Sequence, residues 1–250
     1  MGTPAFKQSL SGLPKSFERQ RQQMVARDIA GRGVRDSLVL EAMRRVPREL
    51  FLSLKLREFA YEDSPVPIAE EQTISQPYIV GLMAEALLLR RGEKVLEIGA
   101  GSGYAAAVLS EIAGDVYTVE RLGSLAGQAA ARLADLGYAN VHVLHGDGTR
   151  GWPAHAPYDA IVVAAGGPQI PDSLKDQLKI GGRLVIPVGV DQRTQELVRI
   201  TRISKNEFRR EDLAHVRFVP LIGQEGWTSA IDEGQTRQRR PHPGSSDEGS

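Results

Sequence analysis

Short apolar runs alternate with longer amphipathic stretches through the second half of the chain. The runs are rich in valine, isoleucine and leucine and end at glycine, proline or acidic residues, which is typical of buried strands. The predicted strands are residues 95–98, 116–119, 141–144, 160–163 and 183–188, and helical spacing occupies 104–113, 122–136 and 171–178. Strands that alternate with helices predict a parallel sheet covered on both faces.

The N-terminal third has a helical pattern instead. Residues 17–29 and 38–46 place apolar side chains at helical spacing, and Asp36 or Ser37 is a suitable N-cap for the second helix. Residues 63–68 contain two prolines and are expected to be extended. Pro77 suits the first position of a helix over residues 78–89.

These patterns predict an α/β fold with a doubly wound, mostly parallel, Rossmann-like sheet and an N-terminal helical cap. Two late apolar runs, 196–203 and 216–221, have no helix between them and indicate an antiparallel C-terminal edge. We expect one domain over residues 21–230, with the cap and substrate loop at 21–77 and the α/β core at 78–230. Residues 1–20 are expected to form a flexible arm and residues 231–250 a disordered tail.

Composition excludes several kinds of protein. The 250 residues are 41% hydrophobic and 25% charged, which is ordinary for a globular domain. The formal net charge is zero, so no nucleic-acid partner is expected, although Arg237, Arg239 and Arg240 cluster in the tail. No run of about 18 apolar residues occurs, so no membrane association is expected.

The absence of cysteine removes further possibilities. It excludes disulfides, thiolate metal sites and cysteine nucleophiles. The histidines lack H-x-x-x-H spacing, so no metal site is expected. Residues 1–15 lack the apolar core of a secretion signal, and a cytoplasmic monomer is expected.

A glycine-rich turn follows the first predicted strand, in the sequence V-L-E-I-G-A-G-S-G-Y at residues 95–104. Glycines permit positive φ in a tight turn and let a ligand approach the backbone. The spacing differs from the G-x-G-x-x-G of dinucleotide sites, and Glu97 would repel a pyrophosphate but suits a ligand with an ammonium group. The turn resembles the first motif of class I methyltransferases that use S-adenosylmethionine (SAM). We therefore expect SAM to be bound by Glu97, Gly99, Gly101, Ser102 and Gly103.

Acidic residues also mark later strand ends. Glu120 closes the second strand about 20 residues past the turn, where a carboxylate commonly accepts hydrogen bonds from ribose hydroxyls. Asp147 follows the third strand and is expected to accept from the adenine amino group, with Gly148 leaving room for the ring. An ordinary Asp-Gly turn is the alternative. Asp159 either orients a loop or only caps it.

Several segments together are similar to the protein-L-isoaspartate O-methyltransferase family. Besides the glycine turn, they are V-P-R-E-L-F (46–51), T-I-S-Q-P (73–77), V-E-R (119–121), H-G-D-G (145–148), A-P-Y-D-A-I (156–161), L-K-I-G-G-R-L-V-I-P-V-G (178–189) and V-R-F-V-P-L (216–221). The resemblance covers about residues 20–228. It implies methyl transfer from SAM to the free α-carboxylate of L-isoaspartyl residues in damaged proteins and peptides, with S-adenosyl-L-homocysteine as product. The ester then closes to a succinimide that yields some normal aspartyl, so the family repairs proteins.

The resemblance also implies roles for individual residues. Ser75, the serine of T-I-S, is the implied catalytic residue and holds the acceptor carboxylate, assisted by backbone N–H groups where helix 78–89 begins. A carboxylate is ionised at neutral pH, so no general base is required. The alternative is that Ser75 only caps that helix. The resemblance further implies that Gln72, Thr73 and Ile74 border SAM and that Tyr78 covers it. Val219, Pro220 and Leu221 are expected to form a wall of the peptide groove, either as a strand that pairs with substrate or as an ordinary edge strand, and Trp227 is a candidate lid residue.

Other functions stay open at this point. A class I methyltransferase could act on another carboxylate, a small molecule or RNA. A non-catalytic module could bind SAM or aspartyl peptides. An NAD oxidoreductase is disfavoured by Glu97 and by the glycine spacing.

Overall fold

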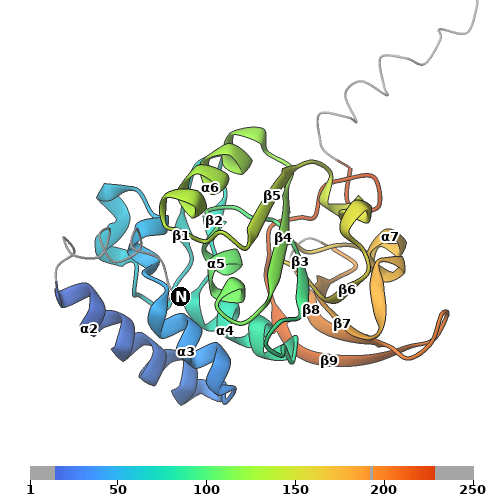
Figure 1. The fold of residues 1–250 in the computed structure, drawn as a ribbon, viewed down its shortest axis with the longest axis horizontal. Coiled ribbons are helices and arrows are strands. Elements are labelled where there is room, and N and C mark those ends of the chain that lie inside the picture. The colour runs from blue at the N-terminus through green and yellow to red at the C-terminus, as the bar shows by residue number, and fades with distance from the viewer. Residues whose placement is uncertain (1–14, 192–193, 229–250) are drawn as a thin grey trace, which may run out of the picture.

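The central feature of the fold is a seven-stranded sheet with the strand order β5-β4-β3-β6-β7-β8-β9 (Figure 1). The computed structural model describes residues 15–191 and 194–228. The strands β3 to β7 pair in parallel, and β8 and β9 are added antiparallel, so the predicted fold class is confirmed. Their bounds are β3 (Lys94–Ile98), β4 (Asp115–Glu120), β5 (Val141–His145), β6 (Tyr158–Val163), β7 (Leu178–Val188), β8 (Gln195–Arg202) and β9 (Phe208–Val216).

Helices cover the parallel part of the sheet on two sides. One side carries α4 (Pro77–Ala86), α5 (Tyr104–Ser110) and α6 (Gly123–Asp135), and the other carries α7 (Asp172–Asp176) and the turns η5 (Gly148–Arg150) and η6 (Pro153–His155) (Figure 1). Side chains alternate along each strand, so Val95 packs with the α4–α6 side while Leu96 and Ile98 pack with the α7 side. No helix within the described ranges has the length and apolar character needed to cross a bilayer.

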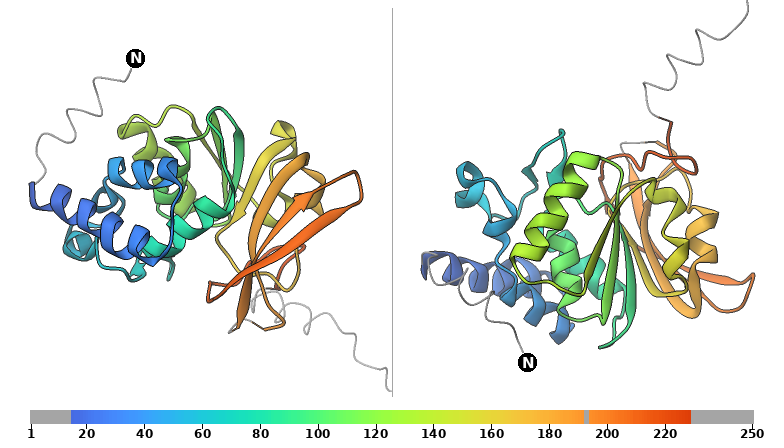
Figure 2. Two further views of the ribbon diagram at one scale, coloured as in Figure 1. Left: turned by 90° about the horizontal axis from the view of Figure 1, so that it is seen from below. Right: turned by 45° about the horizontal axis from the view of Figure 1, so that its top comes forward.

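The N-terminal cap forms an outer layer against α4 and α5 (Figure 2). It contains α2 (Lys15–Met24), the π-helical turn η1 (Val25–Ile29), η2 (Ala30–Arg32), α3 (Ser37–Arg45), η3 (Arg48–Phe51) and η4 (Leu54–Phe59). Asp36 caps α3 as predicted, because its Oδ1 accepts from the Leu38 N–H at 2.8 Å. The cap packs closely on α4, since a Cβ at Gly81 would lie 2.9 Å from Cγ2 of Ile29.

The prediction of a flexible arm over residues 1–20 is wrong for residues 15–20. Residues from Lys15 onward are helical, and Phe17 packs against Tyr61 with ring centroids 6.3 Å apart. The remaining side chains of this helix are charged or polar except for Met24, so the polarity of the sequence did not reveal its buried face. The first 14 residues and the expected tail at 231–250, with Arg237, Arg239 and Arg240, lie outside the described residues.

The strand expected at 216–221 is also misplaced. The edge strand β9 ends at Val216, and the segment after it lies beside Gly166, whose N–H donates to the Val219 carbonyl at 2.8 Å. β9 is rich in charged residues because it is the exposed edge of the sheet, where charge discourages pairing with other chains. It therefore lacks the apolar alternation that reveals a half-buried strand.

Candidate active site

A cavity of about 300 Å³ opens at the carboxyl ends of β3, β4 and β6. The strand order reverses between β3 and β6, and ligands of doubly wound sheets bind at such a switch point. The volume lies in the usual range for small-molecule sites. Twelve of the predicted site residues line this cavity, namely Gln72, Thr73, Ile74, Ser75, Gly99, Gly101, Ser102, Glu120, Gly148, Val219, Pro220 and Leu221.

Glu120 holds the glycine turn in position at the cavity. Its Oε2 accepts from the Gly101 N–H and its Oε1 from the Leu122 N–H, each at 2.9 Å. A carboxylate has about four acceptor positions, so both oxygens keep a lone pair for a ligand hydroxyl. Gly99 and Gly101 have φ of 95° and 52°, which glycine adopts readily. These groups suit a nucleoside, since a carboxylate that can accept from ribose hydroxyls lies beside apolar walls.

A two-stranded hairpin closes one side of the cavity. It pairs β1 (Val66–Pro67) with β2 (Thr73–Ile74), and its turn places Glu70 and Glu71 in the left-handed region at φ of 58° and 56°. Oε1 of Glu70 accepts from the Ser124 hydroxyl at 2.6 Å, which ties the turn to the start of α6. Left-handed backbone is unfavourable for residues with a Cβ, so the packing around the cavity stabilises this turn.

Ser75 lies where three spaces meet. It lines the cavity, a groove of about 550 Å³ and a small enclosed space of about 30 Å³ behind the glycine turn. The helix α4 begins at Pro77 with Gln76 as its N-cap residue, so Ser75 does not cap it. Within residues 15–191 and 194–228 its hydroxyl has no hydrogen-bond partner. Ser75 is therefore free to bind a group that reaches the cavity from the groove.

Comparison with known proteins gives a consistent result. The family model described as protein-L-isoaspartate(D-aspartate) O-methyltransferase matches residues 19–226. A protein-L-isoaspartate O-methyltransferase from Rhodopseudomonas palustris is 67% identical over 87% of this chain and 100% of the relative. A second one, from Pelobacter propionicus, is 59% identical over 85% of this chain and 95% of the relative.

The chain belongs to the protein-L-isoaspartate(D-aspartate) O-methyltransferase family.

Solved structures agree with this membership. A protein-L-isoaspartate O-methyltransferase superposes with a TM-score of 0.75 at 31% identity, covering 89% of this chain and 71% of the other. A Plasmodium falciparum protein described as belonging to the same enzyme class, in complex with S-adenosyl-L-homocysteine, gives a TM-score of 0.71 at 25% identity, covering 81% and 98%. The predicted family and its SAM-dependent methyl transfer to isoaspartyl residues are thus confirmed, and the NAD alternative is wrong.

Two predicted site residues of this family member pack elsewhere in the fold. A Cβ at Gly103 would lie 3.2 Å from Cδ1 of Leu133, so this glycine lets α5 approach α6 rather than facing the cavity. The ring of Tyr78 lies under the Arg32 guanidinium, 3.5 Å from its centroid, and does not cover the cavity. The Tyr78 N–H was expected to help hold the acceptor carboxylate, but it donates to Asp63 Oδ1 at 3.1 Å and is not free for a substrate.

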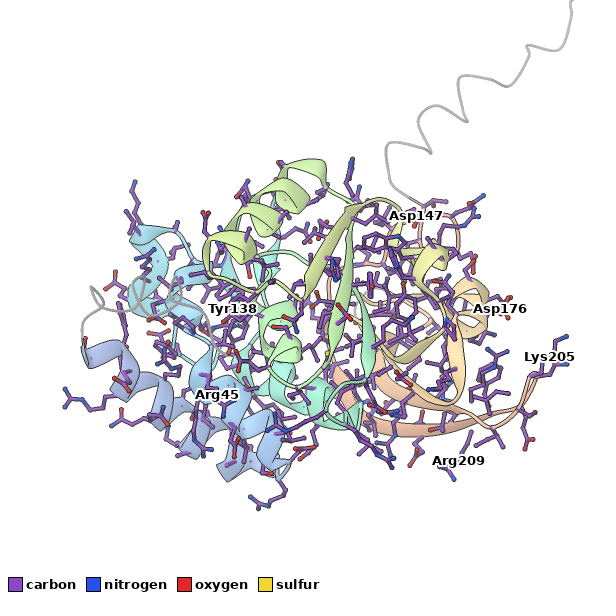
Figure 3. All side chains as sticks on the ribbon, in the orientation of Figure 1. Arg45, Tyr138, Asp147, Asp176, Lys205 and Arg209 are labelled. Carbon is purple, nitrogen blue, oxygen red and sulfur yellow. The ribbon has the colours of Figure 1, made fainter. Side chains whose placement is uncertain are left out.

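Asp147 is occupied by the C-terminal segment. Figure 3 shows it at the upper end of the parallel strands. Its Oδ1 accepts from the Thr149 N–H at 2.9 Å and its Oδ2 from the Gln224 N–H at 2.8 Å. It does not line the cavity, and its carboxylate instead fixes the turn that follows the groove wall.

Asp159 and Trp227, whose roles the sequence left open, form hydrogen bonds within the fold. Asp159 accepts from the Lys94 N–H at 3.0 Å and from Lys179 Nζ at 2.8 Å, so it ties neighbouring strands together. The Trp227 indole donates to the Gly166 carbonyl at 2.9 Å, which anchors the C-terminal segment, and Trp227 does not line the cavity.

Glu97 lies behind the glycine turn and not in the large cavity. It is 1% exposed and accepts from the Thr118 hydroxyl at 2.6 Å through Oε2. Burial raises its pKa to about 8, assisted by the charge of Glu120 and opposed by the Thr118 hydrogen bond. Glu97 is thus mostly protonated at pH 7. Its Oε1 has no hydrogen-bond partner in the described residues, and Glu97 lines the same small space as Ser75.

Sequence reasoning missed most of the apolar cavity wall. Ile98, Val119 and Leu122 line the cavity, as do Ala164 and Ala165 after β6. Their position was available as a signal, because each lies at or just after the carboxyl end of a predicted strand. The charged wall residue Arg121 lies after the same strand end as Val119, whereas Glu71 gave no comparable signal.

Substitution of Glu120 by glutamine is expected to weaken S-adenosyl-L-homocysteine binding by about 10- to 30-fold. The amide nitrogen cannot accept a hydrogen bond, so either Gly101 or Leu122 loses its partner, at about 1–2 kcal/mol for a charge-assisted bond. Isothermal titration calorimetry checks this, with exposed Glu62→Gln as the matched control. An unchanged affinity would mean that the turn keeps its shape without Glu120.

Proposed function

We propose that Ser75 receives the α-carboxylate of an L-isoaspartyl residue at the junction of the groove and the cavity, where it meets the methyl donor. The observation that carries this proposal is the position of Ser75, whose unpartnered hydroxyl lines both spaces. An acceptor entering from the groove and a cofactor in the cavity would approach each other only at this junction.

The cavity residues are proposed to hold SAM as the sequence indicated. Glu120 would accept from the ribose hydroxyls, while Gly99, Gly101, Ser102 and Gly148 would present backbone to the ligand and Gln72, Thr73 and Ile74 would border it from the hairpin. When bound, SAM supplies the methyl group. Because neither Glu97 nor Asp147 lines the cavity, we do not assign them direct cofactor contacts in this arrangement.

Ser75 is proposed to act by positioning. Its hydroxyl would donate to one oxygen of the acceptor carboxylate and leave the other oxygen facing the cavity. The carboxylate is already ionised at neutral pH, so no proton has to be removed before transfer. Alignment of reacting groups alone can supply a large part of a rate enhancement, which fits a site with one neutral donor.

Val219 and Pro220 are proposed to form the groove wall by packing, whereas Leu221 lines only the cavity. The Val219 carbonyl and the Leu221 N–H are already bonded to Gly166, each at 2.8 Å, and proline has no N–H. The Val219 carbonyl and the Leu221 N–H are therefore not available to a peptide added as a strand. Val219, 37% exposed, offers its side chain to the peptide instead.

We also propose a cytoplasmic, monomeric protein without a nucleic-acid partner, organised as one domain over about residues 21–230. The cap and the α4–α6 side share one hydrophobic core, which supports a single domain. The zero formal net charge supports the lack of a nucleic-acid partner, and the lack of cysteine supports the cytoplasmic location.

The proposed function is tested by transfer of labelled methyl from SAM to a matched pair of peptides. One peptide carries L-isoaspartyl and the other normal L-aspartyl at the same position. The expected result is base-labile methylation of the isoaspartyl peptide alone. Methylation of neither peptide by a protein that still binds S-adenosyl-L-homocysteine would overturn the assignment of the acceptor.

A further inference from the structure

The groove beside Ser75 contains one ionisable side chain, that of Arg217. The other lining residues are apolar or carry neutral polar groups, such as Thr73 and Gln76. A peptide bound there therefore meets a single positive charge on an otherwise uncharged surface.

Arg217 is available to a ligand. Within the described ranges its guanidinium makes no hydrogen bond or ion pair, and the residue is exposed. The carboxylates on β8 and β9 have other partners: Glu196 contacts the His215 ring nitrogen at 2.8 Å, and Glu211 and Asp212 form ion pairs with Arg199 at 2.9 Å and Arg210 at 2.8 Å. The charge of Arg217 is thus not neutralised by its own strand or the adjacent one.

The position of Arg217 separates it from the transfer point. Val219 lines both the cavity and the groove, whereas Arg217 lines only the groove. The segment is fixed between them, since the Phe218 N–H donates to Gln195 Oε1 at 2.8 Å. Exposure alternates along it, so that Arg217 and Val219 are exposed while Phe218 is half-buried. The guanidinium therefore faces a neighbour of the isoaspartyl residue rather than the acceptor carboxylate.

We infer that Arg217 is a specificity-determining residue that binds an aspartate or glutamate side chain next to the isoaspartyl residue of the substrate. The inference rests on the proposed function. A guanidinium and a carboxylate form charge-assisted hydrogen bonds, and a lysine at the same substrate position is repelled. An exposed pair contributes up to about 1 kcal/mol, which corresponds to about a fivefold preference.

The test uses isoaspartyl peptides that differ at one neighbouring position, with glutamate, glutamine or lysine in turn on either side of the isoaspartyl residue. For the wild-type protein kcat/KM is expected to be about three- to fivefold higher for glutamate than for glutamine at one position, and lower still for lysine. The difference is expected in KM rather than kcat, because the contact is the same before and during transfer. Raising the salt concentration to about 1 M should remove most of it.

Variants at Arg217 decide the assignment. Arg217→Gln is expected to bring the ratio of kcat/KM for the glutamate and glutamine peptides to about one, and Arg217→Glu to reverse the preference in favour of lysine. Arg209→Gln, on the outer part of β9 away from the groove (Figure 3), is the matched control and should keep the preference. A preference that survives Arg217→Gln, or no preference in the wild type, would overturn the inference while the methylated glutamine peptide upholds the proposed function. Failure to methylate any isoaspartyl peptide would overturn both.

Discussion

Replacing Ser75 by alanine is expected to lower kcat on an isoaspartyl peptide by about 10²-fold, while the affinity for S-adenosyl-L-homocysteine stays within about threefold. Ser75 lines the cavity, the groove and the small space behind the glycine turn, and its hydroxyl has no partner in the described structure. Its removal leaves the acceptor carboxylate free to adopt unproductive orientations, and small misplacements of reacting groups are costly. Single-turnover methyl transfer and calorimetric titration measure the two quantities separately.

Ser64→Ala is the matched control for this experiment. Ser64 also lies in the region before α4 but lines neither the cavity nor the groove, so wild-type turnover and affinity are expected. Equal losses of turnover and affinity in Ser75→Ala would instead mean that Ser75 orders the cofactor side. A variant with wild-type turnover would remove Ser75 from the mechanism.

Substitution of Glu97 by glutamine is expected to raise the free energy of unfolding at pH 8 by an amount on the order of 4 kcal/mol, measured without ligand. Glu97 is buried and its pKa rises from 4.5 to about 8 in the folded protein. Between those values the folded state keeps a proton that the unfolded state releases, so wild-type stability falls as pH rises through this window. Glutamine removes the titration and its carbonyl can still accept from Thr118.

The pH dependence identifies the cause. The stability advantage of Glu97→Gln should nearly vanish at pH 4 and grow steadily to pH 8, in urea unfolding curves at several pH values. Glu62→Gln changes an exposed carboxylate and should give no such trend. A difference that is the same at all pH values would show that Glu97 is not protonated in the native protein.

The elements that sequence predicted well are those with a local signal. The glycine turn, Asp36 at its cap position and Pro77 at the start of α4 each reflect the conformation of a few neighbouring residues. The strand ends located Glu120 correctly, because parallel strands bring their carboxyl ends to one edge of the sheet.

The residues whose surroundings were not predicted depend on partners far away in the chain. Asp147 is bound by Gln224, and Tyr78 is covered by Arg32. Glu97 is an acid whose charge depends on burial by α4 and α5, and a sequence motif does not report burial. Local spacing places such residues near a site, and only the packed structure decides which of their atoms face it.

The order of the wall segments along the chain has a consequence for synthesis in the cell. The nucleoside side of the cavity is complete at Ala165, whereas the last part of the wall it shares with the groove, Val219 and Pro220, comes more than 50 residues later. At ribosomal speeds of 5–20 residues per second, the wall emerges roughly 3–11 s later. A nascent or prematurely terminated chain would therefore lack the surface that receives damaged proteins, so methylation by such a fragment is not expected.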